Sequence, residues 1–263
     1  MRERITRYAW IAVGVAAAAI IVSELLVGFG QLGWSRYVGD DYRIYMDATN
    51  RWLSGGSYFL PSQLAGPHPL EMGDVMYPPV ALWLFVPFTV LPAILWWAIP
   101  AVVTAAALWH LRPPAWTIAL SLVVFVYPKF LALVFDGNPG MYLIAALAAA
   151  VAWGTPASLA LFKPSLFPLA LFGIRSRRWW YGAAALVALS LPVLPLTLTW
   201  AQVVLNVQEG GGLTYSLIDL PVSALPLLWW AGSTRANAIR RRQAVGWSFS
   251  LMSGRAADPI KPA

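Results

Sequence analysis

The chain has 263 residues, of which 59% are hydrophobic and 11% are charged, and it contains no cysteine. Soluble domains carry about 25% charged residues, so this composition excludes an ordinary soluble globular protein. Without cysteine there are no disulfides, thiolate metal sites or cysteine nucleophiles, and the presence of only two histidines argues against a histidine-based metal centre. We therefore predict no metal site and no cofactor.

The net charge of +7 is concentrated in short arginine clusters. Clusters of this kind beside apolar segments are typical of the cytoplasmic side of a membrane protein. We interpret them as topology signals and expect no nucleic acid as a partner. The clusters are Arg2, Arg4 and Arg7; Arg175, Arg177 and Arg178; and Arg235, Arg240, Arg241 and Arg242.

The hydrophobic residues form about eight continuous runs, at residues 8–29, 79–91, 93–110, 116–134, 141–153, 157–173, 180–200 and 216–232. A membrane-spanning helix needs about 20 apolar residues, and continuous runs argue against a β-barrel. The pattern predicts an all-α, polytopic transmembrane helical bundle over residues 1–243, with the N-terminus in the cytoplasm. Run 79–91 is short enough to be a half-helix. If two of these runs form a re-entrant hairpin, the turn at 136–140 would lie on the other side of the membrane. Residues 244–263 are predicted to form a disordered cytoplasmic tail.

Residues 30–76 form the long polar stretch, which we predict to be an outer loop. Within it, residues 40–52 favour an amphipathic helix lying on the outer membrane surface, ended by Gly55-Gly56. Asp41 falls where the N-cap of this helix is expected. Two roles for Asp41 stay open and are compatible: a cap, or a general base that takes a proton from an acceptor hydroxyl.

Lys163 interrupts an apolar run, in the segment Leu161-Phe162-Lys163-Pro164-Ser165. A cation inside a membrane costs a few kcal/mol and indicates a functional site unless it is paired or reaches an interface. The alternatives are therefore substrate binding, snorkelling to the membrane surface, or a partner among the other buried groups.

Several short motifs follow one another in a characteristic order: Asp41-Tyr42-Arg43-Ile44-Tyr45, Gly55-Gly56-Ser57-Tyr58, Tyr77-Pro78-Pro79, Gly137-Asn138-Pro139-Gly140, Lys163-Pro164 and Arg177-Arg178-Trp179-Trp180. This order resembles glycosyltransferase family 87, the polyprenyl-phosphate-mannose-dependent mannosyltransferases of the GT-C superfamily. The turn differs from the family pattern, because Asn138 stands where glutamine is usual and Gly140 stands where asparagine is usual.

The resemblance implies a GT-C-like enzyme of the plasma (inner) membrane with its active-site loop on the extracytoplasmic side. Its partners would be membrane lipids, a polyprenyl-phosphate sugar donor and a lipid or glycan acceptor, and mannose would be transferred with inversion. Asp41 would be the catalytic base, and Lys163 and Arg43 would stabilise the departing phosphate. The remaining substrate-binding residues would be Tyr45, Tyr77 and Asn138.

Two alternatives to an active transferase stay open. The family is commonly longer than this chain, so a truncated or non-catalytic relative is one of them. The other is a small transporter or lipid-binding membrane protein, with Lys163 at its substrate site.

Overall fold

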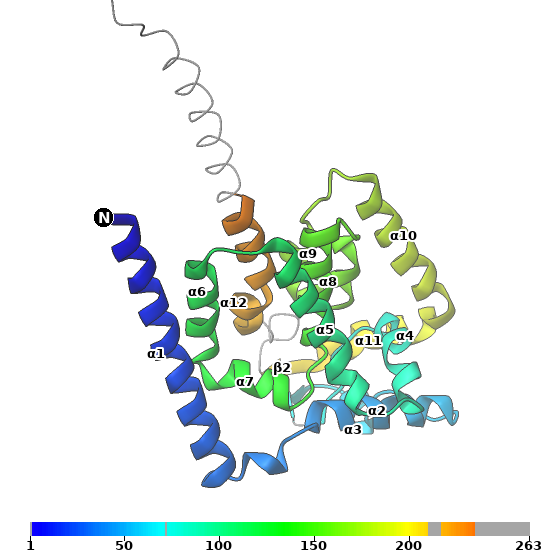
Figure 1. Ribbon diagram of the computed structural model, residues 1–263. Coiled ribbons are helices and arrows are strands. Elements are labelled where there is room, and N and C mark those ends of the chain that lie inside the picture. The colour runs from blue at the N-terminus through cyan, green and yellow to red at the C-terminus, as the bar shows by residue number, and fades with distance from the viewer. Residues whose placement is uncertain (1, 72, 210–216, 235–263) are drawn as a thin grey trace, which may run out of the picture.

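The computed structural model describes residues 2–71, 73–209 and 217–234, and these are mostly helical (Figure 1). The predicted all-α class is confirmed for this part of the chain; the predicted tail, 244–263, lies outside the described residues. The helices are α1 (Arg2–Gly30), α2 (Asp40–Leu53), α3 (Pro61–Leu64), α4 (Leu82–Phe85), α5 (Ile94–Leu111), α6 (Ala115–Phe125), α7 (Pro128–Phe135), α8 (Gly140–Trp153), α9 (Phe167–Ala170), α10 (Arg177–Ser190), α11 (Leu194–Asn206) and α12 (Leu220–Ser223). Two short strands, β1 (His68–Pro69) and β2 (Val207–Glu209), pair in parallel.

The prediction of eight spans is wrong for the described residues. Three helices there are long and apolar enough to cross a membrane: Arg4–Gly30, Ile94–Leu111 and Arg177–Asn206. The last of them consists of α10, the 3-10 helix η6 (Leu191–Val193) and α11. A fourth is obtained only if α6 and α7, which meet at 86°, count as one bent span. Hydrophobicity alone overestimated the number, because proline breaks the i to i−4 hydrogen-bond pattern inside apolar runs.

The run at residues 79–91 shows this effect. It is divided into the 3-10 helix η2 (Pro79–Ala81), the four-residue α4 and the 3-10 helix η3 (Val86–Thr89), with Pro87 inside η3. Both α4 and η3 pack against α2. This run therefore covers α2 with short pieces and supplies no long helix of its own.

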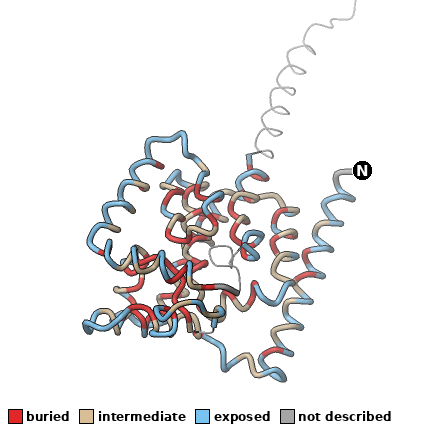
Figure 2. Tube along the Cα trace, turned by 180° about the vertical axis from the view of Figure 1, so that it is seen from behind, coloured by how far each residue is buried: buried red, intermediate tan, exposed pale blue. Residues whose placement is uncertain are grey.

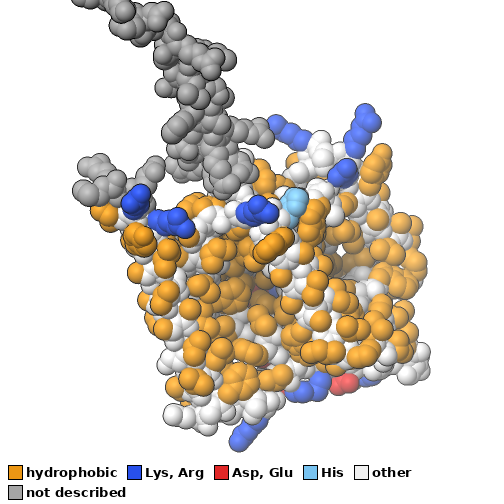
Figure 3. All heavy atoms as spheres, in the orientation of Figure 1, with side chains coloured by type: hydrophobic (Ala, Val, Ile, Leu, Met, Phe, Trp, Pro, Cys, Tyr) orange, Lys and Arg blue, Asp and Glu red, His pale blue; other side chains and the backbone are white. Residues whose placement is uncertain are grey.

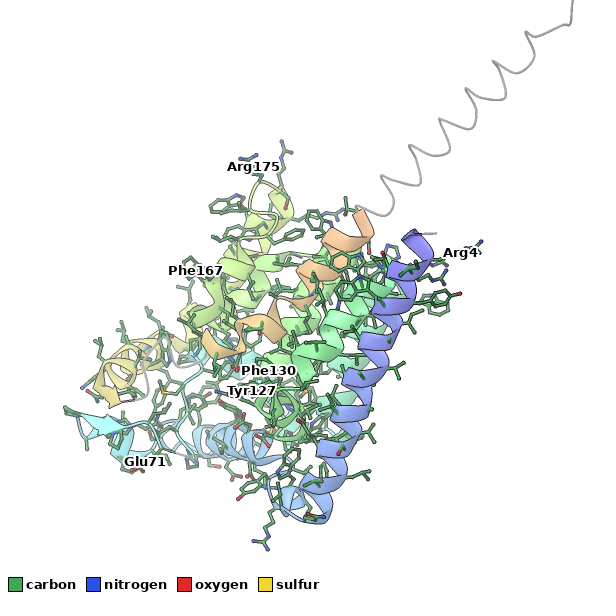
Figure 4. All side chains as sticks on the ribbon, turned by 90° about the vertical axis from the view of Figure 1, so that its left-hand side faces the viewer. Arg4, Glu71, Tyr127, Phe130, Phe167 and Arg175 are labelled. Carbon is green, nitrogen blue, oxygen red and sulfur yellow. The ribbon has the colours of Figure 1, made fainter. Side chains whose placement is uncertain are left out.

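The molecule has two polar ends separated by a hydrophobic belt. Arg4 and Arg175 lie at one end, which we call the arginine end, and Glu71 lies at the other (Figure 4). Lys and Arg side chains gather along the upper rim in Figure 3, and hydrophobic side chains cover most of the surface below it. Helix α1, whose main contact is with α6, is largely exposed along its length (Figure 2). Long, exposed apolar helices are compatible with a location in a membrane.

Helix α2 lies across the end opposite the arginine end, here called the α2 end (Figure 1). Tyr45, Met46, Ala48 and Thr49 are buried on its inner face, which confirms the predicted amphipathic helix. It ends at Leu53, just before the predicted Gly55-Gly56 stop.

The prediction that Asp41 is the N-cap of this helix is wrong. The cap is Gly39, which has φ of 80° and donates its backbone N–H to the Phe135 carbonyl at 2.8 Å. That left-handed glycine begins the helix earlier than expected. Asp41 consequently lies in the first turn, and its carboxylate accepts a hydrogen bond from another segment of the chain.

Residues 154–178 form a hairpin that starts and ends at the arginine end. At its mouth, the Arg178 guanidinium donates to the Gly154 carbonyl at 3.2 Å. Deeper in, Ser158 donates to the Trp179 carbonyl at 2.7 Å, and the Trp179 indole donates to the Ala170 carbonyl at 2.6 Å. Both arms are therefore attached to α10, and residues 157–173, predicted as a span, fold back on themselves within this hairpin.

The hairpin consists of short helical pieces around its tip at Lys163-Pro164. The descending arm is the 3-10 helix η4 (Ala157–Phe162), and the tip continues through η5 (Pro164–Leu166) into α9. Phe167 lies between the levels of Arg175 and Glu71 (Figure 4). A span that ran through to the opposite face would instead have separated Gly154 from Arg178 by the thickness of the membrane.

Candidate active site

Asn138 connects three segments that are distant in sequence. Its side-chain amide donates to the Asp41 carboxylate at 2.5 Å. Its side-chain oxygen accepts from the Gly140 backbone N–H at 2.8 Å and from the Tyr77 hydroxyl at 3.2 Å. These four residues, Asp41, Tyr77, Asn138 and Gly140, are called the Asn138 network below. Because the amide is held at both ends, it fixes the Asp41 carboxylate in one orientation.

The turn at 136–140 lies against α2, at the α2 end. The Tyr42 N–H donates to the Asp136 carbonyl at 3.1 Å, and the Trp96 indole donates to the Gly137 carbonyl at 2.7 Å. Gly137 has φ of 73°, and a Cβ there would lie 2.8 Å from the Trp97 ring. Glycine is therefore required for the turn to approach α2 closely enough to place Asn138 beside Asp41.

Lys163 is buried at the tip of the hairpin and is paired with Asp219. Its Nζ lies 3.1 Å from the Asp219 carboxylate, and the two residues are 2% and 8% exposed. Of the possibilities drawn from the sequence, a buried partner is the one observed. Asp219 closes η8 (Leu217–Asp219). The sequence reasoning missed it, although it is the one acidic residue in the apolar run 216–232.

Lys163 also lies next to the Asn138 network. Its Nζ is 5.5 Å from the centre of the Tyr77 ring, and a Cβ built on Gly140 would lie 3.6 Å from the same atom. Asp41 and Lys163 therefore lie on either side of Asn138 and Tyr77. The structure brings four of the predicted site residues together: Asp41, Tyr77, Asn138 and Lys163.

The pKa of the Asp41 carboxyl is raised above its ordinary value, mainly by burial. The hydrogen bond from Asn138 and the positive charge of Lys163 lower this pKa, whereas the charges of Asp40 and Asp219 raise it further. A carboxylate with a raised pKa is a stronger base, and it remains useful as long as its pKa lies near or below the working pH.

Asp41 opens onto a cavity of about 220 Å³, called the Asp41 cavity below. Asp136, at the end of α7, lines the same cavity, and burial followed by the charges of Asp41 and Asp40 raises its pKa to about 6. In the described ranges, no three His, Cys, Asp or Glu side chains are grouped so that they could hold a metal ion. The complete lining is Trp34, Tyr37, Asp40, Asp41, Ile44, Ala132, Phe135 and Asp136.

Of the other two predicted binding residues, Arg43 points away from this cluster, whereas Tyr45 packs against Tyr77, one of its members. The Arg43 guanidinium is exposed, pairs with Asp40 on the same helix and donates to the Val38 carbonyl at 3.1 Å. Tyr45 is buried, and its ring stacks on Phe85 at 5.0 Å and meets the edge of Tyr77 at 5.2 Å. These contacts give Tyr45 a packing role beneath the site, and the substrate role of both residues stays a prediction.

Lys163 faces little free space in this state. The cavity beside it has about 10 Å³, which is room for about one water molecule. A phosphate group could reach Lys163 only if the surrounding side chains moved. The lining of this small space is Met76, Tyr77, Pro78, Lys163, Pro164, Ser165 and Trp200.

Comparison with known proteins yielded no match: no family model matches the chain, and no curated protein or solved structure is significantly similar to it.

Proposed function

We propose that this protein is a membrane glycosyltransferase that moves mannose from a polyprenyl-phosphate donor to a hydroxyl of a lipid or glycan acceptor. The observation that carries the proposal is the Asp41 carboxylate, oriented by Asn138 at 2.5 Å and open to a cavity at the α2 end. A positioned carboxylate beside a cavity is the arrangement that general-base catalysis needs. The resemblance of the motif order supplies the sugar and the donor.

In the proposed reaction the acceptor hydroxyl transfers its proton to Asp41 as its oxygen attacks the anomeric carbon of the donor. A new carbon–oxygen bond forms there while the bond from that carbon to the phosphate oxygen breaks. The polyprenyl phosphate leaves with the electron pair, and the configuration of the sugar inverts from β to α. Because the phosphate is already a good leaving group, no general acid is required.

Lys163 is the cation proposed to stabilise the departing phosphate. It is now paired with Asp219, and the phosphodiester of the donor would replace that carboxylate as its partner. An exchange of one anion for another keeps the buried cation compensated. The displaced Asp219 carboxylate would then have to take up a proton or turn towards water, because an unpaired buried charge is costly. The two carboxylates Asp41 and Asp219 would then act on opposite sides of the transferred sugar, one as base and one as a displaceable partner of Lys163.

The proposed sidedness has the arginine end in the cytoplasm and the α2 end outside. Arg4, Arg175 and Arg178 lie at or next to the arginine end, which is the distribution expected of cytoplasmic loops. Asp41 would then lie on the extracytoplasmic side of the inner membrane, where a lipid-linked donor is accessible and a nucleotide sugar is not.

The direct test is transfer by the purified protein in detergent. We expect labelled mannose to move from polyprenyl phosphate mannose to a membrane-lipid or glycan acceptor fraction, with α configuration in the product. GDP-mannose supplied alone should give no product. Transfer from GDP-mannose, or no transfer from the lipid donor to any acceptor fraction, would contradict the proposal.

A transporter is the second candidate, favoured by the buried Lys163–Asp219 pair at the tip of a re-entrant hairpin. Intramembrane ion pairs of this kind mark substrate or proton pathways. Proteoliposomes distinguish the two functions. Solute uptake without a lipid donor that is lost in Lys163→Met and retained in Asp41→Ala would indicate transport.

A further inference from the structure

The Asp41 cavity has the dimensions and lining of a site for one small ring. Its volume of about 220 Å³ is below the roughly 300–1,000 Å³ of pockets that take drug-sized ligands. Aromatic side chains from the segment before α2, Trp34 and Tyr37, form part of its lining, and Asp41 and Asp136 form another part. A flat apolar surface combined with hydrogen-bond acceptors suits a ring that has one apolar face and hydroxyl groups at its edge.

The Trp34 side of the cavity is held in place by the end of α1. The Trp34 ring packs directly over Gly28, where a Cβ would come within 2.3 Å of it, and Phe29 meets it edge-on at 6.2 Å. Trp34 itself begins a 3-10 turn, η1 (Trp34–Arg36). The indole is therefore anchored on the protein and does not depend on a ligand for its position.

Asp136 is placed by its backbone and leaves its carboxylate available. Its carbonyl accepts from the Tyr42 N–H at 3.1 Å. Nothing in the described ranges donates a hydrogen bond to its side chain or forms an ion pair with it, whereas the neighbouring Asp41 carboxylate accepts from Asn138. Such a carboxylate beside a cavity is an acceptor for ligand hydroxyls.

The charge of the lining restricts the ligand further. Asp40, Asp41 and Asp136 all line the cavity, and no Lys or Arg is among its described lining residues. Arg43 pairs with Asp40, so the uncompensated negative charge of the lining comes from Asp41 and Asp136. Like charges at short range cost several kcal/mol in recognition. A phosphate or carboxylate on the ligand would therefore be rejected, and an uncharged hydroxylated ligand would be preferred.

We propose that the Asp41 cavity binds the acceptor as a neutral sugar ring that packs on Trp34 and Tyr37 and donates a hydroxyl hydrogen bond to Asp136. This inference rests on the proposed function, because it takes Asp41 as the base for a neighbouring hydroxyl of the same ring. Asp136 is a residue that determines acceptor affinity and specificity. It follows that the donor, with its phosphate, enters from the Lys163 side and the acceptor enters from the Trp34 side.

The first test measures binding without catalysis. Saturation-transfer NMR on the full chain in detergent is run with methyl α-mannoside as the neutral probe and methyl glucuronoside as the anionic one. We expect binding of the neutral probe only, weakened about 10-fold in Asp136→Asn and in Tyr37→Ala. Asp47→Asn, an exposed carboxylate of α2 outside the cavity, is the matched control and should bind like the wild type.

The second test separates the roles of the two carboxylates in transfer. Asp136→Asn should raise the acceptor KM about 10-fold with kcat within about threefold of wild type, whereas Asp41→Asn should lower kcat by at least about 100-fold. The elevated KM should be restored in part by Asp136→Glu, which keeps a carboxylate.

Failure of this inference and failure of the proposed function give different results. If the wild type transfers mannose but Asp136→Asn and Tyr37→Ala leave both probe binding and acceptor KM unchanged, the acceptor site is elsewhere and the enzyme assignment stands. If the wild type transfers nothing, the proposed function fails, and the NMR result still decides whether the cavity binds a neutral sugar. Binding of the anionic probe, or binding that EDTA abolishes, would overturn the inference in either case.

Discussion

Asn138 is the residue on which the chemistry of Asp41 depends most directly. It supplies the hydrogen bond to the carboxylate, and its own orientation is set by the Tyr77 hydroxyl and the Gly140 N–H. Replacing it by an isosteric carboxylate therefore changes the charge next to Asp41 while keeping the shape of the turn.

For Asn138→Asp we expect the acid limb of the kcat/KM profile to move to higher pH by about one unit or more. The substitution exchanges a donor for a negative charge at the Asp41 carboxylate, and a neighbouring like charge raises a carboxyl pKa. The other charges that act on Asp41, those of Asp40, Lys163 and Asp219, are unchanged. A pH–rate series on both proteins measures the shift, and superimposable profiles would show that Asp41 is not the titrating base.

Ionisation of Asp136 should lower the stability of the folded protein as the pH rises. Its pKa is raised to about 6 from 3.8, so its ionised form is disfavoured in the folded protein. The contribution of Asp136 to the free energy of unfolding is therefore fully present below about pH 4 and is lost as the pH rises through about 6. Asp136→Asn should unfold at a higher temperature than the wild type at pH 8, with a smaller difference at pH 4.5.

Unfolding midpoints in detergent, recorded at one scan rate, check this expectation. Asp47→Asn, at an exposed position, should show no pH-dependent gain. A gain of equal size at both pH values would mean that the variant acts through packing and not through the charge of Asp136.

At the scale of elements, the hairpin 154–178 is positioned by α10. Gly182 on α10 lies so close to the descending arm that a Cβ there would come within 2.4 Å of Pro156 and 2.5 Å of the Ser158 hydroxyl. This close approach fixes how far the hairpin enters the molecule, and hence where Lys163 lies relative to Asn138.

Gly182→Leu should therefore destabilise the protein by about 1–3 kcal/mol through overpacking and reduce transfer by displacing Lys163. The matched control is Gly30→Ala at the end of α1, where a Cβ would meet no atom within 4 Å. Unfolding in denaturant and the transfer assay are measured on both variants. If Gly182→Leu behaves like Gly30→Ala, the contact with α10 does not position the hairpin.

The elements that sequence reasoning predicted correctly are those with a local signal. Helix α2 follows from its amphipathic spacing and from Gly55-Gly56 after its end. The number of spans could not be obtained in the same way, because a hydropathy pattern does not distinguish a long helix from an apolar segment that proline divides and folds back. Hairpin 154–178 and run 79–91 are both apolar segments that proline divides into short pieces.

The site was predictable only in part, because some of its residues carry no local signal in the sequence. Asp41 was found from its place at the start of the predicted helix and Lys163 because it interrupts an apolar run. Tyr77 and Asn138 were found through the order of short motifs, and the structure brings the four residues together. Asp219 was not found, and Asp136 was not assigned to the site, because each is a single acidic residue whose meaning depends on tertiary neighbours. Arg43 was grouped with the site by its motif, although its side chain pairs with Asp40 instead.

At the scale of the whole molecule, the proposed sidedness can be tested because the chain has no native cysteine. Ile174 is exposed near the mouth of the hairpin, and Ser54 is exposed at the end of α2. In intact spheroplasts, a membrane-impermeant maleimide should label Ser54→Cys, whereas Ile174→Cys should react only after the membrane is permeabilised. The opposite pattern would place Asp41 in the cytoplasm and contradict the use of an extracytoplasmic lipid donor.

The central claim is that Asp41 is the base of a mannosyl transfer, and one comparison tests it most directly. Purified wild type, Asp41→Asn and the surface control Asp47→Asn are assayed for transfer from polyprenyl phosphate mannose, after unfolding midpoints have shown that all three are folded. The account predicts that Asp41→Asn loses at least about 100-fold in kcat, the usual contribution of a general base, while Asp47→Asn stays near the wild type. Equal transfer by Asp41→Asn and the wild type would contradict it.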